Sequence, residues 1–556
     1  MHHLNRYVFL ALLLLTAIPF YLKSQESTDK KFDLGELHGN FQVDAQLYNP
    51  DSAIGAPPVP EKLRSNIFGN FIYTRKLGPG NLNAGVRYEA YLPALQGFDS
   101  RYKGVGIPYR FIQYKWEGLD VTVGNFYDQF GSGMVFRVFE DRNLGYDNAM
   151  DGLRLKYTLL KGIHLKGVIG IQRFFMEKGP GIVRGIDGDI DFNETFKFMR
   201  ETKFKFILGG SFVSKYQSDQ DPVYKLPENV GSWAARANIQ YGNFTLSGEY
   251  VNKINDPSTV NNFIYRKGEA LLVNAGFSVK NFGIALSAKR VDNMSFRSDR
   301  TATGNNLSIN YLPALTRQHT YNLAATIYPY ATQPNGEMAA QADVNYTFPK
   351  GSALGGKYGT SILVNYSIVN GLDSTQRHDG YGYDSPFLKV GRQAYWHDLN
   401  VQIDKKITKE FKFSLMYMNF LYDKDIVQGL AGYGTITGHI GVIDMTLRLP
   451  KQNTLHWEIQ GLYADKQKDF GHWATGLVEF NYHSKFFVAV QDQYNFGNLD
   501  AKKRIHYLTG TMGCTLKTTR VTLTYGRQRA GIFCVGGVCR TVPASNGLTL
   551  SITSNF

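Results

Sequence analysis

The sequence predicts an all-β protein, a large antiparallel transmembrane β-barrel of about 22 to 26 strands. Three observations lead to this fold class. The chain begins with an export signal and contains no later apolar run long enough for a membrane helix. Its composition is rich in aromatic residues and glycine. Apolar and polar residues alternate in repeated segments, which is the pattern of strands with one face in lipid and the other in a lumen.

The N-terminus has the features of a secretory signal peptide. A short basic start, residues 1–6, precedes the apolar run YVFLALLLLTAI at residues 7–18. This run is shorter than the roughly 20 apolar residues of a bilayer-spanning helix, and the polar stretch from Ser24 has no stop-transfer pattern. We therefore predict a signal peptide over residues 1–24, a short periplasmic segment over 25–35 and an outer-membrane barrel over 36–556. The predicted location is the bacterial outer membrane.

Composition and charge favour a barrel over a soluble sandwich. Aromatic residues make up 14% of the chain and charged residues only 19%, and such aromatics suit the interfacial girdles and lipid face of a barrel. The formal charge of +14 falls to +12 when Arg6 and Lys23 leave with the signal peptide. Two interpretations stay open: Lys and Arg that face anionic lipopolysaccharide, or a lumen that favours anions. Without a clustered basic run, nucleic acid is excluded as a partner.

The first mature segment illustrates the strand pattern. Leu37, Phe41 and Leu47 fall on one face of a predicted strand, while His38 and Gln42 fall on the other. The same alternation recurs in segments of about 9 to 12 residues to the end of the chain. In a barrel, the apolar face meets lipid and the polar face lines a wet lumen.

The connections between these segments alternate in length. Tight polar turns occur at residues 241–243, 279–281, 482–485 and 517–520. Longer segments rich in Gly, Asp, Asn and Pro occur at residues 49–63, 128–151, 217–231, 370–393 and 423–438. Short turns on one side and long loops on the other are typical of outer-membrane barrels, with the long loops outside. The alternation loses its parity between residues 291 and 358, which leaves the strand count open.

The last segment ends on an aromatic residue. Leu548, Leu550, Ile552 and Ser554 alternate with polar residues, and the pattern reaches Phe556. This resembles the terminal strand of bacterial outer-membrane barrels, in which a final Phe belongs to the signal read by the insertion machinery. We therefore predict Phe556 as an insertion signal and that machinery as a partner, besides outer-membrane lipid and lipopolysaccharide.

The densest group of polar residues lies at residues 124–152. Its members are Arg137, Glu140, Asp141, Arg142, Asp147, Asn148 and Asp151. One interpretation is a loop folded into the lumen and held there by salt bridges and Asx turns. A second is a calcium or sugar site, because the carboxylates and the amide supply hard oxygen donors, although their spacing matches no EF-hand. A third is a surface that binds a partner. Apart from this possible calcium ion, we predict no cofactor, and the sequence does not identify a metal.

Two further features concern chemistry. Cys534 and Cys539 enclose the segment VGGV, and such a pair in an oxidising exterior predicts a small disulfide. The chain contains no G-x-S-x-G elbow, zinc helix, P-loop or dinucleotide fingerprint, so we do not expect an enzyme. Separately, the aromatic segments 88–110 and 328–337 suit carbohydrate stacking or protein contacts, but we favour their interpretation as the edge of a girdle.

Several of these motifs together resemble a known family. They are the segments 88–110 and 328–337, DNAMDG at 147–152, GPGIVRGIDGD at 179–189 and FPKGSALGGKYG at 348–359. The chain is similar over nearly its whole mature length to an uncharacterised outer-membrane β-barrel family of the Bacteroidota, catalogued as a domain of unknown function. The resemblance implies an outer-membrane location but carries over no catalytic or binding residue. A role beside the secretion or gliding apparatus is implied by association alone.

These features lead to two functional hypotheses. The first is a channel or transporter for small polar solutes, with a lumen constricted by the loop at 126–152. The second is a non-conducting outer-membrane component that docks a secretion or surface-protein complex. The polar inner face and positive charge favour the first, and the long aromatic loops favour the second.

Overall fold

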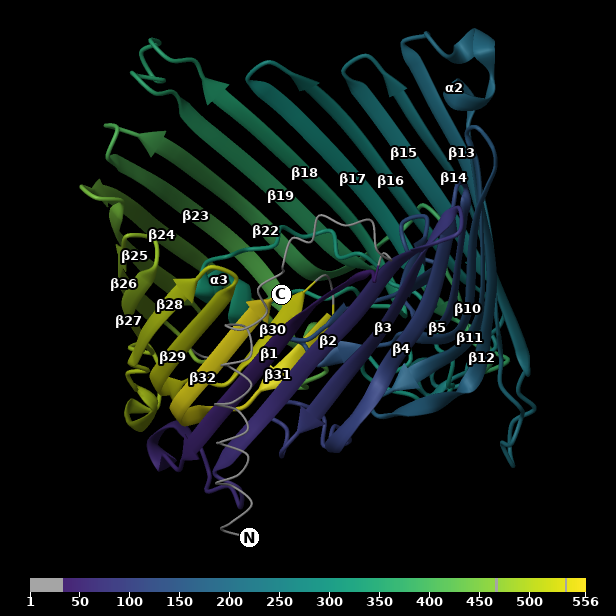
Figure 1. The fold of residues 1–556 in the computed structure, drawn as a ribbon. Coiled ribbons are helices and arrows are strands. Elements are labelled where there is room, and N and C mark those ends of the chain that lie inside the picture. Colours follow the sequence, from purple (N-terminus) through teal and green to yellow (C-terminus); the bar gives the residue numbers. More distant parts are fainter. Residues whose placement is uncertain (1–33, 466–468, 536–537) are drawn as a thin grey trace.

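The computed structural model describes residues 34–465, 469–535 and 538–556, without the side chains of residues 533–538. The predicted signal peptide, residues 1–24, and most of the segment 25–35 lie outside the described residues. The rest forms one antiparallel barrel of 24 strands (Figure 1). This confirms the predicted fold class, and the strand number falls within the predicted range.

The barrel strands follow one another around the ring in chain order. They are β1 (Glu36–Asn49), β2 (Leu63–Leu77), β3 (Gly80–Tyr91), β4 (Gly104–Trp116), β5 (Leu119–Phe126), β10 (Met150–Leu160), β11 (Ile163–Phe174), β12 (Glu177–Asp191), β13 (Phe204–Tyr216), β14 (Asn229–Tyr241), β15 (Phe244–Lys253), β16 (Gly268–Val279), β17 (Phe282–Asp292), β18 (Gly336–Phe348), β19 (Thr360–Leu372), β22 (Val390–Lys406), β23 (Phe411–Asp423), β24 (Thr435–Leu449), β25 (Asn453–Ala464), β26 (Trp473–Tyr482), β27 (Phe486–Tyr494), β28 (Thr509–Leu516), β29 (Thr519–Gln528) and β32 (Ser545–Asn555).

The ring closes between its first and last strands. β1 pairs with β32 in a register that runs from Asn40 opposite Asn555 to Asn49 opposite Asn546. Beyond β32, the backbone of Phe556 exchanges hydrogen bonds with Gly39. The sheet therefore has no free edge, which is what a strand protein in lipid requires, because an unpaired backbone group there has no water to bind.

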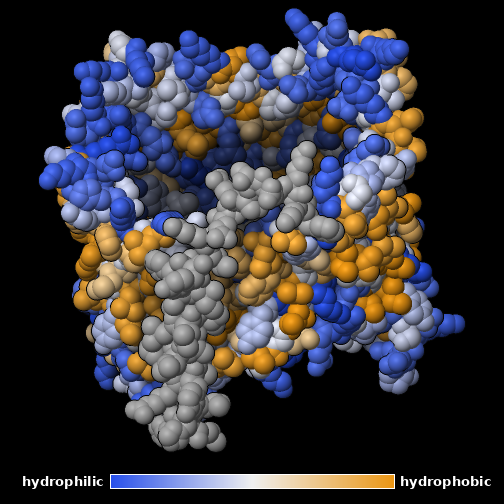
Figure 2. Space-filling model, in the orientation of Figure 1, coloured by the Kyte–Doolittle hydropathy of each residue, from blue (hydrophilic) through white to orange (hydrophobic). Residues whose placement is uncertain are grey.

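The alternation predicted for β1 is confirmed. Leu37 and Leu47 are exposed on the outside of the barrel. The Asn40 and Gln42 side chains instead point inward, where both accept hydrogen bonds from Arg142 of a loop inside the lumen. Figure 2 shows apolar residues gathered over the outer wall of the barrel.

The two ends of the barrel differ. At one end, the upper one in Figure 1, short turns such as 78–79, 117–118 and 242–243 join the strands. The turn 192–203 at this end is longer and contains α2 (Phe192–Thr195) and η3 (Lys197–Met199). The opposite end carries the long loops. The predicted loss of parity has a simple cause, because residues 293–335 form one long loop between β17 and β18 and add no strand to the barrel.

The loops contain short elements of their own. These are η2 (Ser52–Ile54), β6 (Asp128–Phe130), β7 (Phe136–Val138), β8 (Glu140–Asp141), β9 (Tyr146–Asp147), η4 (Thr259–Asn261), α3 (Asn322–Thr326), β20 (Thr375–Gln376), β21 (Tyr383–Asp384), α4 (Lys424–Gln428), η5 (Ala501–Lys503), β30 (Gly531–Val535) and β31 (Val538–Val542). Within the described ranges, no helix has the length and apolar character needed to cross a bilayer.

The inner wall is divided into two zones. Near the loop end, the inward-facing residues are buried; some are apolar, for example Val213 and Val251, and others are charged, for example Lys215, Lys253 and Glu89. The apolar ones form one continuous core with residues of the loops 127–149 and 293–335. The expected polar inner face therefore holds only in part for this half of the wall, because the loops that fold inward also cover apolar residues there. Towards the turn end the barrel is hollow and lined by polar residues (Figure 2).

Candidate functional site

The candidate site is the barrier inside the lumen and the cavity in front of it. We call residues 127–149 the ionic loop and residues 293–335 the bridging loop, and the two together the plug. The loops contact each other directly: Arg137 N donates to Ile309 O (2.8 Å), and Tyr311 N donates to Gly133 O (2.9 Å). The sequence predicted the ionic loop as a loop inside the lumen, and the structure places it there.

A buried network of charges fixes the ionic loop to the wall. Asp147 of the loop accepts hydrogen bonds from Arg87 on β3 and from Arg173 on β11, the latter at 2.7 Å. Both guanidinium groups also bind Glu89 of β3, at 2.8 Å from Arg87 and 2.6 Å from Arg173. The Arg and Glu side chains are almost completely buried. Each buried charge therefore has a partner of opposite sign, as burial demands.

Two more of the predicted residues extend this network. Glu140 pairs with Arg87 (2.8 Å) and with Arg142 (2.8 Å). Arg142 then reaches the inner face of β1 through Asn40 and Gln42. The network thus ties one short loop to strands β1, β3 and β11, which the sequence places far apart.

The other predicted residues have separate roles. Asn148 is buried and donates to Ser308 O of the bridging loop (2.8 Å), while the Arg137 guanidinium lies over the Tyr311 ring (4.1 Å). Asp141 closes a local turn by accepting from Leu144 N (3.1 Å). Asp151 does not belong to this network. It pairs with Arg110 and Lys178, whose side chains are about half exposed.

This arrangement does not favour the calcium interpretation. Glu140 and Asp147 point their carboxylates at arginines, so a metal ion would have to displace guanidinium groups. In the described part of the chain, the His, Cys, Asp or Glu side chains that gather closely enough to hold an ion are Asp444, His456 and Glu458 on β24 and β25. Of the five predicted oxygen donors, Glu140, Asp141, Asp147 and Asn148 therefore hold the loop in place, Asp151 lies apart from them, and the five do not form a cage.

The bridging loop crosses the whole lumen. At one side, Ser308 O accepts from Gln172 of β11 (2.7 Å). At the other, Leu323 N at the start of α3 donates to Gln460 Oε1 of β25 (2.9 Å). β11 and β25 stand half-way round the ring of 24 strands from each other. The loop therefore spans a diameter of the barrel.

Between these points, single hydrogen bonds hold the bridging loop to the far wall. Arg317 donates to Asn400 (2.7 Å) and Gln402 (2.6 Å) on β22. His319 pairs with Asp398 of the same strand (2.7 Å). Tyr321 donates to an Asp444 carboxylate oxygen on β24 (3.3 Å), and burial raises the pKa of Tyr321 to about 12. The phenol therefore stays protonated at neutral pH and keeps its donor.

Aromatic packing completes the far side of the plug. Tyr328 lies 5.0 Å from Phe420 and 5.4 Å from Tyr422, ring centre to ring centre. Tyr330 stacks near Trp396 at 6.1 Å. Both tyrosines are buried, so the assignment of segment 328–337 to a girdle edge is wrong. These rings sit inside the lumen because the bridging loop carries them there.

The loop 529–544 supports α3 from the loop side. Arg529 donates to Thr326 and to Asn322 Oδ1 (3.3 Å), and burial lowers the pKa of Arg529 to about 10. In the hairpin of β30 and β31, the backbone of Cys534 lies directly opposite Cys539. This register is compatible with the predicted disulfide. Because the Cys534 side chain lies outside the described residues, the disulfide stays a prediction.

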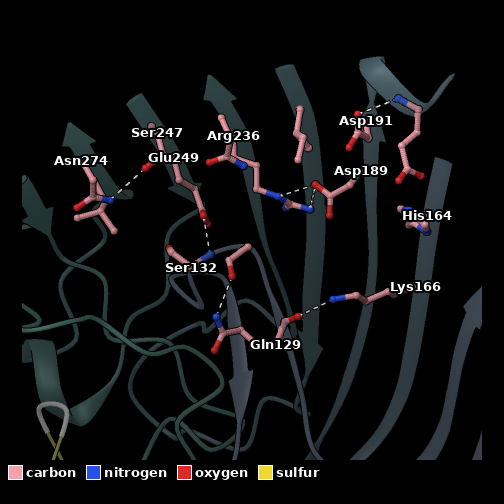
Figure 3. A pocket seen from close by; sticks show the side chains of 16 residues that line it. Gln129, Ser132, His164, Lys166, Asp189, Asp191, Arg236, Ser247, Glu249 and Asn274 are labelled. Atoms are coloured by element: carbon pink, nitrogen blue, oxygen red, sulfur yellow. Dashed lines mark hydrogen bonds and ion pairs between the residues drawn. The ribbon is translucent and has the colours of Figure 1, made fainter. Parts of the chain in front are cut away.

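In front of the plug lies a polar cavity of about 580 Å³, which we call the vestibule pocket. Its lining comes from the inner faces of β11 to β16 and from the tip of the ionic loop (Figure 3). Charged residues of both signs line it, among them Lys166, Asp189, Asp191, Arg236 and Glu249. The backbone N–H of Ser132, at the loop tip, donates to Glu249 Oε2 (2.7 Å).

The loop tip can approach Glu249 this closely because it contains glycine. Gly131 has a positive φ of 50°, and a Cβ there would lie 2.5 Å from Glu249 Oε2. Sequence reasoning identified the ionic loop but missed Glu249, the vestibule pocket and the bridging loop. The one available signal for the bridging loop was the loss of parity after residue 291.

The closed barrel, its apolar outer wall and the loops that fold into its lumen define the class of this protein: a β-barrel with loops across its lumen, whose features support a location in the bacterial outer membrane. The family model "Family of unknown function (DUF6029)" matches residues 4–556, and the chain belongs to that family. The predicted origin in the Bacteroidota stays a prediction. No curated protein matches this chain.

Among solved structures, several barrels are similar to this chain at low identity. The P pilus usher (PapC) translocation pore has a TM-score of 0.38 and 9% identity, over 94% of this chain and 99% of that one. OccAB4 of Acinetobacter baumannii has a TM-score of 0.37 and 12% identity, over 79% and 100%. The siderophore receptor PirA of Pseudomonas aeruginosa has a TM-score of 0.39 and 11% identity, over 95% and 81%. At this level the likeness carries no argument about function.

Proposed function

We propose that this protein is a channel or transporter for small polar solutes, which rests in a closed state with the plug as its gate. The observation that carries the proposal is the way the lumen is divided. A hollow polar vestibule leads to a barrier whose far side is held by separate hydrogen bonds, from Arg317, His319 and Leu323. Such a barrier can open without any change in the barrel wall.

The energies of these contacts support a movable bridging loop. A hydrogen bond of this kind contributes roughly 0.5–1.5 kcal/mol net, because water satisfies both partners once the bond opens. Breaking one partner of a buried ion pair costs about 3–5 kcal/mol. The ionic loop is held by several such pairs, whereas the far part of the bridging loop has hydrogen bonds and one buried pair, His319 with Asp398. We therefore assign the opening movement to the bridging loop.

The direction and the solute class follow from the two ends of the barrel. Outer-membrane barrels carry their short turns on the periplasmic side, so the vestibule opens to the periplasm and the plug closes the outer end. The vestibule pocket is lined by Lys166 and Arg236 but also by Asp189, Asp191 and Glu249. Its charges do not support the interpretation of an anion-selective lumen, and the proposed solutes are polar without a requirement for negative charge.

The test is single-channel recording of the purified protein in planar bilayers. We expect the wild type to stay closed with rare openings. The double variant Arg317→Ala/His319→Ala should raise the open fraction at least fivefold, because it removes the side-chain hydrogen bonds of the bridging loop to Asn400, Gln402 and Asp398 of β22. The matched control is Arg377→Ala, which removes an arginine from an exposed pair with Asp379 outside the plug and should leave the openings unchanged.

Silence of both the wild type and the double variant, with both proteins folded, would exclude the channel. That result would favour the second hypothesis, a non-conducting component that docks a secretion or surface-protein complex. Heat-modifiable migration on gels verifies folding of every variant. Equal open fractions in the wild type and the double variant would exclude the bridging loop as the gate.

A further inference from the structure

The vestibule pocket contains a carboxylate that the barrel itself does not neutralise. Glu249 on β15 is only 5% exposed and lines the pocket. One of its oxygens accepts the Ser132 N–H (2.7 Å). The other oxygen, Oε1, is buried and has no hydrogen-bond partner with acceptable geometry among the described residues. The Ser132 hydroxyl lies close to this carboxylate. A buried carboxylate left in this way costs free energy unless another group binds it.

The cations near the pocket are already occupied. Arg236 pairs with Asp187 (2.8 Å) and with Asp189 (2.7 Å). Lys166 donates to Gln129 O (2.9 Å) and lies 3.6 Å from Asp187. Figure 3 shows the Arg236 side chain directed at Asp189 and the Lys166 side chain directed at Gln129, with Glu249 directed at the loop tip. Among the described residues, no cation pairs with Glu249.

The rest of the lining adds negative charge and neutral hydrogen-bonding groups. Asp191, the N-cap of α2, and Glu194, within α2, lie on the rim, and Asn238, Ser247 and Asn274 line the wall. Asn274 donates to Ser247 (3.3 Å), so part of this wall is already ordered. A volume of about 580 Å³ falls within the range of pockets that hold small organic ligands. The pocket thus offers uncompensated negative charge and hydrogen-bonding groups in one place.

We propose that the vestibule pocket binds a small organic cation that carries an ammonium or guanidinium group, with Glu249 as its anionic anchor. The cationic group binds Glu249 at the inner end of the pocket, and polar atoms of the ligand bind the Asn and Ser side chains of the wall. A bare metal ion fits less well, because these carboxylates are not among the described residues that gather closely enough to share one. This inference rests on the proposed function and names the solute class.

The experiment is isothermal titration calorimetry of the full-length protein in detergent at pH 7.5. The probe is Nα-acetyl-L-argininamide (argininamide below), and the matched probe is Nα-acetyl-L-citrullinamide (citrullinamide below), in which a neutral urea replaces the guanidinium. The acetyl group removes the α-ammonium from both probes, so the guanidinium is the only cationic group that differs. We expect argininamide to bind at least tenfold more tightly than citrullinamide. Glu249→Gln should weaken argininamide binding about 10- to 100-fold, because it removes a charge-assisted hydrogen bond but keeps an acceptor for Ser132.

Two further variants make the outcome specific. Glu194→Gln, on the rim, should weaken binding only about two- to fivefold, and Glu201→Gln, exposed on the same turn but outside the pocket, should not change it. The proposal is overturned if argininamide fails to bind the wild type, if citrullinamide binds equally well, or if Glu249→Gln binds as the wild type does. Argininamide binding without any channel current would support the cation-binding pocket and exclude the channel. Channel currents without argininamide binding would support the channel and exclude the cation-binding pocket.

Discussion

The two loops of the plug fill the same lumen but are held by different chemistry. The ionic loop is fixed by charges that are buried on both sides, with Asp147 and Glu89 each bound by both Arg87 and Arg173. The far part of the bridging loop relies on hydrogen bonds to β22, β24 and β25 and on aromatic packing. The difference shows that the ionic loop is joined to the wall more strongly than the far part of the bridging loop, and it supports the proposal that the bridging loop is the part that moves.

The largest expected effect comes from the ionic loop. Arg173→Met removes one partner of the buried network and leaves Glu89 and Asp147 short of positive charge. We expect a loss of about 3–5 kcal/mol in the free energy of unfolding, measured by urea titration with heat-modifiable migration as the readout. Arg110→Met is the matched control, because Arg110 is half exposed in its pair with Asp151 and should cost at most about 1 kcal/mol. Equal losses in the two variants would contradict the distinction between the loops.

A smaller effect is expected at the far anchor of the bridging loop. Gln460→Leu removes the acceptor for the backbone N–H of Leu323 and leaves that buried group unsatisfied. The free energy that holds the plug in place should fall by about 1–3 kcal/mol, while the stability of the barrel itself should not change. We expect a higher open fraction in planar bilayers with an almost unchanged urea midpoint of the barrel. A lower midpoint with unchanged openings would show instead that this loop stabilises the wall.

The smallest expected effect is that of Arg317→Ala alone. Its two hydrogen bonds, to Asn400 and Gln402, are partly accessible to water, so their loss should cost roughly 0.5–1.5 kcal/mol. The open fraction should rise less than in Gln460→Leu. Limited proteolysis from the loop side, compared between the two variants, gives a second measure. A larger effect from Arg317→Ala than from Gln460→Leu would place the main anchor on β22 and not on β25.

Much of the barrel could be predicted because the outer face of each strand follows a simple rule. In β1 and in the strand that ends near Phe556, apolar residues at every second position face lipid. The ionic loop was also predictable, because charges as dense as those from Arg137 to Asp147 need partners wherever they are buried. Their partners Arg87, Glu89 and Arg173 were not predictable, because they depend on the register of strands far along the chain.

The bridging loop was missed for a related reason. It has few charges, and its apolar residues, such as Ile309, Leu315 and Leu323, resemble those of a strand when the sequence is read alone. The inner wall under the plug has the same ambiguity. Val251 and Val291 are apolar because the plug covers them, yet in sequence they cannot be distinguished from residues that face lipid. Glu249 was hidden because a single carboxylate within a strand gives no pattern.

The path of the bridging loop across the barrel has a mechanical consequence. A ring of 24 strands is wide, and lateral pressure from the membrane tends to flatten it into an oval. The bonds from the bridging loop to Gln172 on one side and to Gln460 on the other join opposite walls. They act as a cross-brace that resists widening of the barrel along this diameter. Release of either end, as the proposed opening requires, would remove this connection and make the cylinder easier to deform along this diameter, while the strand pairing of the wall stays intact.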